Sequence, residues 1–283
     1  MKSILVHLDA SPRSAARLAI AHRLAREQGA RLTAVYAVLP MLLSTPWATV
    51  DGMAAAMPML EEIDRDQRAA ARTIFEAEAA GGDIEWAEAG VDGLHAALLD
   101  RALYADLLVL GQTDPGDTRA GALPPDMVPT LIVDSGKPAL IVPYAGAFSG
   151  ASSGDFPGAA EGVVLLAWKP SRESARAVDA ALPWLQTAAE VHIAGPLEPD
   201  GEGRRPIAQL EVWLRLRGVT APVQVHAIGR DGVGDELLSL AADVAANLLV
   251  MGCYGHSRAR EFVLGGASQT VLRSMTLPVL MAH

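Results

Sequence analysis

The residues best suited to chemistry lie near the end of the chain, in a spaced set of glycines that follows an apolar run. Residues 248–251 are all apolar and stop at Gly252, which is typical of a buried parallel strand. Gly255 and Gly265 follow, and apolar residues at helical spacing begin after Ser268. A strand that leads through glycines into a helix presents free backbone N–H groups and the positive end of the helix dipole. The stretch therefore predicts a phosphate-binding loop.

Side chains within this loop favour binding over catalysis. His256, Arg258 and Arg260 could offset the charge of a triphosphate. Cys253 has no neighbour that would lower its thiol pKa, so a small filler residue is favoured over a redox-sensitive thiol. The sequence shows no nucleophile elbow, Walker motif, catalytic carboxylate pair or metal-ligand spacing. We therefore expect neither catalytic nor metal-binding residues.

Composition and charge exclude several classes of protein. The 283 residues are 51% hydrophobic with a net charge of −10, which indicates a soluble α/β protein without an electrostatic case for nucleic acid. No apolar stretch reaches the roughly 18–20 residues of a membrane helix. The apolar run at residues 4–8 is shorter than the about 7–15 residues of a signal-peptide core. A single cysteine excludes an internal disulfide, so we expect a cytoplasmic protein with no membrane contact.

The glycine loop belongs to the second of two copies of one unit. Three segments recur in the same order, and the offset between copies falls from 160 to about 140 residues. The recurring pairs are residues 11–14 with 171–174, 106–111 with 247–252, and 137–142 with 277–282. Copy one therefore carries about twenty extra residues, near positions 40–59. We expect a lid over the core of that domain; a flexible lid over a ligand, or a contact surface, is the alternative.

Each copy alternates strands with helices. The predicted strands lie near residues 3–8, 31–38, 83–89, 106–110 and 138–143, and near 163–168, 190–195, 222–228, 247–251 and 278–282. Ser11 and Ser171 are placed to cap the first helix of each copy. The alternation predicts an α/β fold of two tandem, open, parallel five-stranded sheets with helices on both faces. The predicted domains are residues 1–145 and 162–283, joined by a linker at 146–161 that is rich in Gly, Ala and Ser.

The chain resembles the tandem universal stress proteins over nearly its whole length. The resemblance rests on Gly252, Gly255 and Gly265, on the Asp-Ala-Ser segment at residues 9–11, and on the closing Pro-Val-Leu and Pro-Ala-Leu strands. It implies two units of the adenine-nucleotide alpha-hydrolase-like type, of which some members bind ATP and others do not.

The two copies depart from the family pattern in different ways, and copy one departs in its loop. It keeps Asp9, which the resemblance places near the adenosine end of a nucleotide. Its loop, however, carries Asp114 and Asp117 where phosphate charge would lie, and Pro115 removes a backbone donor. We therefore predict that copy one binds no phosphate.

Copy two keeps the loop but changes its surroundings. Lys169 stands in the place of Asp9, and Gly266 stands where ATP-binding members have serine or threonine. Ser268 could replace that hydroxyl from another angle; loss of one such hydrogen bond, about 0.5–1.5 kcal/mol, would weaken binding without abolishing it. The predicted nucleotide-binding residues are Ala167, Trp168, Lys169, Ser171, Met251, Gly252, Tyr254, Gly255, His256, Arg258, Gly265, Gly266, Ala267 and Ser268.

The resulting hypothesis is a non-enzymatic stress-response regulator that binds one ATP, or a related adenine nucleotide, per chain. Any hydrolysis would be slow and incidental, and an accompanying Mg²⁺ is left open. The alternative is a nucleotide-free stress protein that acts as a protein-interaction module. The resemblance also implies that residues 140–142 and 279–282 pair edge to edge, as a pseudo-twofold dimer within one chain. A homodimer of two chains is expected in addition.

Overall fold

The computed structural model describes residues 1–38, 50–89, 94–114, 116, 124, 126–145, 162–197, 204–229, 231–253 and 266–283. Within residues 50–89, the side chains are described from residue 56 onward. Contacts divide the chain into two compact units, Met1–Ser135 and Gly136–His283. The predicted linker at 146–161 lies outside the described residues, and the predicted domain boundaries stay predictions. No helix among the described residues is long and apolar enough to cross a membrane.

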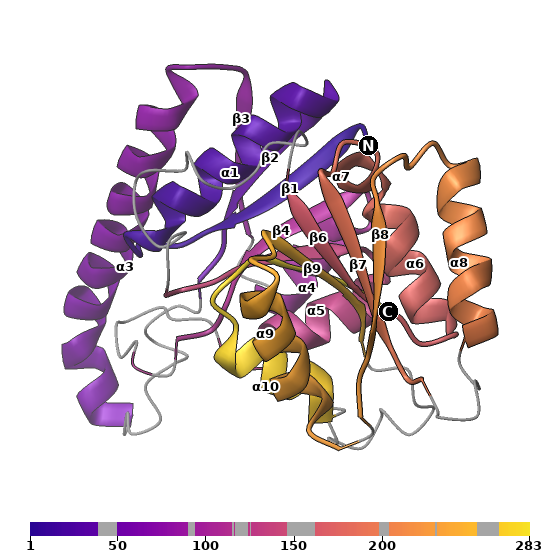
Figure 1. Ribbon diagram of the computed structural model, residues 1–283. Coiled ribbons are helices and arrows are strands. Elements are labelled where there is room, and N and C mark those ends of the chain that lie inside the picture. Colours follow the sequence, from indigo (N-terminus) through magenta and orange to yellow (C-terminus); the bar gives the residue numbers. More distant parts are fainter. Residues whose placement is uncertain are drawn as a thin grey trace. The chain divides into compact units, whose positions relative to one another are not determined.

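Unit 1 is a parallel sheet between two pairs of helices. Its elements are β1 (Ser3–Leu8), α1 (Arg13–Gln28), β2 (Arg31–Tyr36), α3 (Val50–Ala79), β3 (Ile84–Glu88), α4 (Leu94–Ala102), β4 (Leu107–Gly111) and α5 (Met127–Ser135). The strands lie in the order β3-β2-β1-β4 and are all parallel. Helix α1 packs on α3, as Figure 1 shows, and α4 packs on α5. Right-handed crossovers place these two pairs on opposite faces of the sheet.

Unit 2 repeats this arrangement and adds β5. Its elements are β5 (Ala139–Val142), β6 (Val163–Ala167), α6 (Arg172–Ala180), α7 (Leu182–Leu185), β7 (Glu190–Gly195), α8 (Arg204–Leu216), β8 (Val223–Ala227), α9 (Val233–Asp243), β9 (Leu248–Gly252), α10 (Gly266–Ser274) and β10 (Val279–Ala282). The strand order is β5-β10-β9-β6-β7-β8. Only β5 is antiparallel, and its Leu140 pairs with Leu280 of β10. This confirms the predicted pairing of the two closing strands.

The α/β class and all ten predicted strands are confirmed within the described residues. The apolar runs became central strands because both faces of a parallel sheet are covered, and the side chains of residues 107–110 and 248–251 are accordingly 5% exposed or less. The extra residues of copy one lengthen a helix, since α3 has 30 residues and α8 has 13. The part of the insertion at residues 39–49 lies outside the described residues.

The serine caps differ between the units. Ser171 is extended, and its hydroxyl accepts a hydrogen bond from the backbone N–H of Ser174, so it caps α6 as predicted. The prediction for Ser11 is wrong, because α1 begins after Pro12 without a side-chain cap. The backbone N–H of Ser11 donates instead to the carboxylate of Asp9, 2.7 Å away, which fixes the turn in a different conformation.

Candidate functional site

The predicted site in unit 2 begins where β6 and β9 end side by side. The strands are parallel neighbours, with Ala167 opposite Met251, so their carboxyl ends meet at one edge of the sheet. The chain continues from β6 to β7 on one side, whereas β9 lies on the other side of β6. Such a topological switch point is where open α/β sheets bind ligands. Beyond the strand ends, Trp168 is half-buried and Lys169 is exposed.

Helix α10 supplies the N-terminus that follows the glycine spacer. It begins at Gly266, which is exposed, and a Cβ added there would meet no atom within 4 Å. Its second residue, Ala267, is half-buried, and Ser268 is 5% exposed, so the serine hydroxyl lies inside the unit and not at the exposed tip. Five of the predicted binding residues lie outside the described part of the chain: Tyr254, Gly255, His256, Arg258 and Gly265.

Gly252 has a packing role as well. A Cβ at this position would lie 2.5 Å from the backbone nitrogen of Ser174 and 2.7 Å from the carbonyl carbon of Glu173. The first turn of α6 therefore rests directly on the end of β9. Since these neighbours are backbone atoms that no side-chain rotation can move, the close approach requires glycine.

Glu173 is a buried acid at this point that the sequence analysis did not single out. Burial acts to raise the pKa of its carboxyl group, but hydrogen bonds from Arg172, from its own backbone N–H and from Ser171 lower the pKa to about 2. The charged carboxylate and the Ser171 hydroxyl together satisfy the N-terminus of α6. The only sequence signal was an acid two residues after a serine cap, which also fits an ordinary exposed first turn.

The thiol of Cys253 is buried and protonated. Its side chain is 1% exposed, and Sγ donates to the carbonyl oxygen of Ala282 at 3.4 Å. Burial raises the pKa of the thiol well above its usual range, and the nearby charge of Glu173 raises it further. Because the thiolate is the reactive form, this supports the interpretation of Cys253 as a filler residue.

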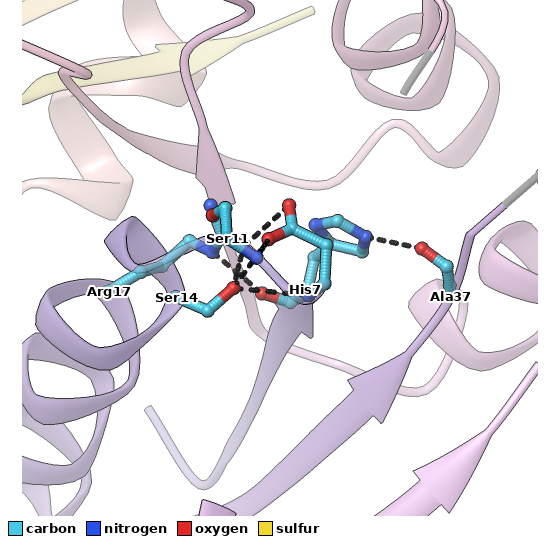
Figure 2. A network of polar contacts seen from close by, with 6 residues as sticks. His7, Ser11, Ser14, Arg17 and Ala37 are labelled. Carbon is cyan, nitrogen blue, oxygen red and sulfur yellow. Dashed lines mark hydrogen bonds and ion pairs between the residues drawn. The ribbon is translucent and has the colours of Figure 1, made fainter. Parts of the chain in front are cut away.

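The corresponding strand ends of unit 1 hold a dense polar network (Figure 2). The carboxylate of Asp9 accepts hydrogen bonds from the Ser11 backbone, from the Ser14 hydroxyl at 2.8 Å and from Arg17 at 3.2 Å. Burial acts to raise the pKa of Asp9, but the charge of Arg17 leads the opposing effects and holds it well below its usual range. Asp9 is therefore charged and its oxygens are engaged within the unit.

His7 completes this network on β1. Its ring is fully buried, and Nε2 donates to the carbonyl oxygen of Ala37 at 2.7 Å. Burial, followed by the charge of Arg17, lowers the pKa of His7 to about 4, so the imidazole is neutral at physiological pH.

In the loop that follows β4, the carboxylate of Asp114 forms an ion pair with Arg13 at 2.6 Å. Within the described residues, no group of three or more His, Cys, Asp or Glu side chains could hold a metal ion.

Residues 162–283 match the model of the universal stress protein family. A universal stress protein from Archaeoglobus fulgidus DSM 4304 aligns with 99% of this chain and 95% of its own, at 17% identity and a TM-score of 0.65. A protein from Pseudomonas aeruginosa PAO1, described as functionally unknown, aligns with 99% of this chain and 92% of its own, at 15% identity and a TM-score of 0.55. No curated protein sequence matches the chain.

The family model covers the candidate site of unit 2, from β6 to the end of the chain, and the structural likeness extends over unit 1. At these identities the structural matches establish the fold alone. The chain therefore has the fold of a universal stress protein throughout, and its residues 162–283 match the model of that family.

Proposed function

We propose that the chain is a non-enzymatic regulator of the stress response that binds one adenine nucleotide, with ATP as the first candidate. The observation that supports this most is the exposed N-terminus of α10, the helix that follows the switch-point strand β9 and the glycine spacer in sequence. The first N–H groups of a helix and its dipole form an anion site when nothing in the protein covers them. A cytoplasmic location and a homodimer are part of the same proposal.

The charges of unit 2 favour α10 over α6 as the phosphate site. The N-terminus of α6 is already satisfied by Ser171 and by the buried carboxylate of Glu173, which would repel an anion. Lys169 is exposed at the end of β6 and could attract a phosphate. No described side chain of this site is placed as a general base, since Glu173 caps a helix and is buried beside Arg172. Binding, not hydrolysis, is the function that this arrangement supports.

Calorimetric titration with ATP tests the proposal. The wild type is expected to bind about one equivalent per chain, and Gly255→Glu, which places a carboxylate in the glycine loop, is expected to abolish binding. Absence of binding at millimolar ATP would contradict the proposal. Two equivalents per chain would show that unit 1 also binds. Repeating the titration with and without Mg²⁺ shows whether the metal accompanies the nucleotide.

A protein-interaction module without nucleotide is the second candidate, because α8 exposes large apolar side chains. Val212 is 58% exposed and Leu216 is 80% exposed, four residues apart on α8. Exposed apolar side chains of this kind are characteristic of contact surfaces. If the titration shows no nucleotide binding, replacement of Val212 and Leu216 by serine becomes the next experiment, with loss of assembly in analytical ultracentrifugation as the expected result.

A further inference from the structure

Unit 1 has a switch point of its own, between β1 and β4. The chain runs from β1 to β2 and β3 on one side, and β4 pairs with β1 on the other, with Val6 opposite Val109. In an open α/β sheet, the crevice at the carboxyl ends of these two strands is the usual place for a ligand. In this unit the side chain of Arg17 lies at the same place.

The guanidinium group of Arg17 connects three elements at this point, and Figure 2 shows its contacts with β1 and α1. Its Nε donates to the carbonyl oxygen of His7 on β1 at 2.6 Å. Its Nη2 donates to the Ser14 hydroxyl on α1 at 2.8 Å and to Asp9 at 3.2 Å. Its Nη1 lies against Gly111, the last residue of β4, so closely that a Cβ on Gly111 would overlap it. The Arg17 residue is 4% exposed, so the group is enclosed by the unit.

Among the described residues of unit 2, the equivalent position carries no such group. In the repeat, Ser14 corresponds to Ser174, so Arg17 corresponds to Ala177, a fully buried alanine. Asp9, which holds the guanidinium, corresponds to the exposed Lys169. The end of β9 is instead covered by the backbone of α6. The buried arginine of α1 is therefore not repeated at the corresponding position of α6.

We propose that Arg17 is an internal occupant of the ligand crevice of unit 1. Its guanidinium fills the space between the ends of β1 and β4, uses the acceptor oxygens of Asp9 and thereby excludes an external ligand. Arg17 then determines specificity for the whole chain, because it restricts ligand binding to unit 2. Only this last consequence rests on the proposed function. The occupancy of the crevice by Arg17 does not depend on nucleotide binding.

A double-mutant cycle between positions 17 and 111 tests the contact. Gly111→Ala forces a methyl group onto the guanidinium and is expected to lower Tm by about 5 °C or more in the wild-type background. In the Arg17→Ala background the clashing group is gone, so the same substitution should lower Tm by less than about 1 °C. Gly252→Ala is the matched control, because its Cβ would meet backbone atoms of α6 and its cost should be equal in both backgrounds. Equal costs of Gly111→Ala in both backgrounds would overturn the proposal.

Arg17→Ala leaves Asp9 buried without its partner and could prevent folding. In that case the cycle is measured in Asp9→Asn/Arg17→Ala, which removes both charges and still leaves the space beside Gly111 empty. The same two outcomes then apply.

Chemical rescue tests whether the vacated space is a ligand-shaped crevice. Ethylguanidinium chloride should raise the Tm of the Arg17→Ala variant relative to sodium chloride at equal ionic strength. Arg31→Ala is the control, because the Arg31 side chain is 72% exposed and forms its ion pair with Glu85 at the surface. A shift confined to the position 17 variant supports the proposal. The absence of a shift, or an equal shift in both variants, contradicts it.

Discussion

At the scale of single residues, two buried carboxylates give the two units opposite properties. Asp9 holds a buried guanidinium at the switch point of unit 1, whereas Glu173 caps the helix that covers the switch point of unit 2. Both groups have pKa values below the ordinary range of their type, so both are charged at neutral pH. An anion is disfavoured beside either carboxylate, which leaves the N-terminus of α10 as the described position best suited to phosphate.

The first prediction concerns Gly266, where a hydroxyl can be restored. Gly266→Ser is expected to tighten ATP binding about 2- to 10-fold, the value of one neutral hydrogen bond. The side chain fits because a Cβ at this position would meet nothing within 4 Å. Gly266→Ala is the matched control, with the same Cβ and no hydroxyl, and its affinity should equal that of the wild type. If both variants bind ATP with the same affinity, no phosphate lies within reach of this residue.

The second prediction concerns Cys253, whose thiol can be followed alone because the chain has one cysteine. Burial raises the pKa of the thiol, so little thiolate forms, and a reagent reaches the sulfur only when local unfolding exposes it. Labelling by Ellman's reagent at pH 8 should be at least about 100-fold slower in the native protein than in urea. Comparable labelling rates in the native protein and in urea would show an accessible, activated thiol and would support a redox role for Cys253.

At the scale of elements, the sequence predicted every strand but not the residues that occupy the strand ends. Strands 107–111 and 248–252 could be predicted because a parallel strand buried on both faces needs an unbroken apolar run. Arg17 and Glu173 have no comparable pattern, since each looks like an ordinary polar residue in the first turns of a helix. Their roles depend on which strand end the helix faces, which only the assembled sheet determines. Ser11 failed as a cap for a local reason, because its backbone N–H donates to the carboxylate of the neighbouring Asp9.

The third prediction concerns β8, the edge strand that β7 holds partly through a histidine pair. Nδ1 of His192 lies 2.8 Å from Nε2 of His226, and Nε2 of His192 lies 3.2 Å from the carboxylate of Glu190. Since the carboxylate accepts from Nε2, Nδ1 of His192 is the acceptor and His226 donates. Gln224, also on β8, makes a longer contact to Glu190. Burial lowers the pKa of His226, and its electrostatic interaction with His192 lowers it further.

The sign of the pH effect follows from that lowered pKa. The unfolded chain, with a histidine pKa of about 6.5, binds protons more readily than the folded one, so stability is complete above this value and falls as the pH decreases through it. The wild type should therefore lose thermal stability between about pH 7 and pH 5, and His226→Gln should lose less. His95→Gln, which removes a half-buried imidazole beside Asp134 in unit 1, is the control and should keep the wild-type profile. Identical profiles for the wild type and His226→Gln would exclude the pair as the cause.

At the scale of the whole molecule, the last strand of the first sequence copy serves the second unit. Strand β5 lies within the compact unit Gly136–His283, where it pairs with β10 as the antiparallel member of an otherwise parallel set. The side chains of β10 are buried, with Val279, Leu280 and Met281 fully enclosed. Without β5, these residues would form the edge of the sheet. An apolar edge strand with free N–H and C=O groups is a template for pairing with another chain.

The fourth prediction therefore compares two fragments, residues 136–283 and residues 162–283. They share every element of unit 2 except β5, which is itself the edge strand of the longer fragment, so a difference in assembly compares the edge of β10 with the edge of β5. Size-exclusion chromatography with light scattering should show residues 162–283 in a larger assembly than residues 136–283 at the same concentration. An antiparallel pairing of β10 with its own copy would reproduce the pairing that β5 makes in the intact chain, and it is a self-complementary contact that closes at two chains. If residues 162–283 match the assembly state of residues 136–283, then β10 tolerates an open edge, and β5 is dispensable for keeping unit 2 from self-associating.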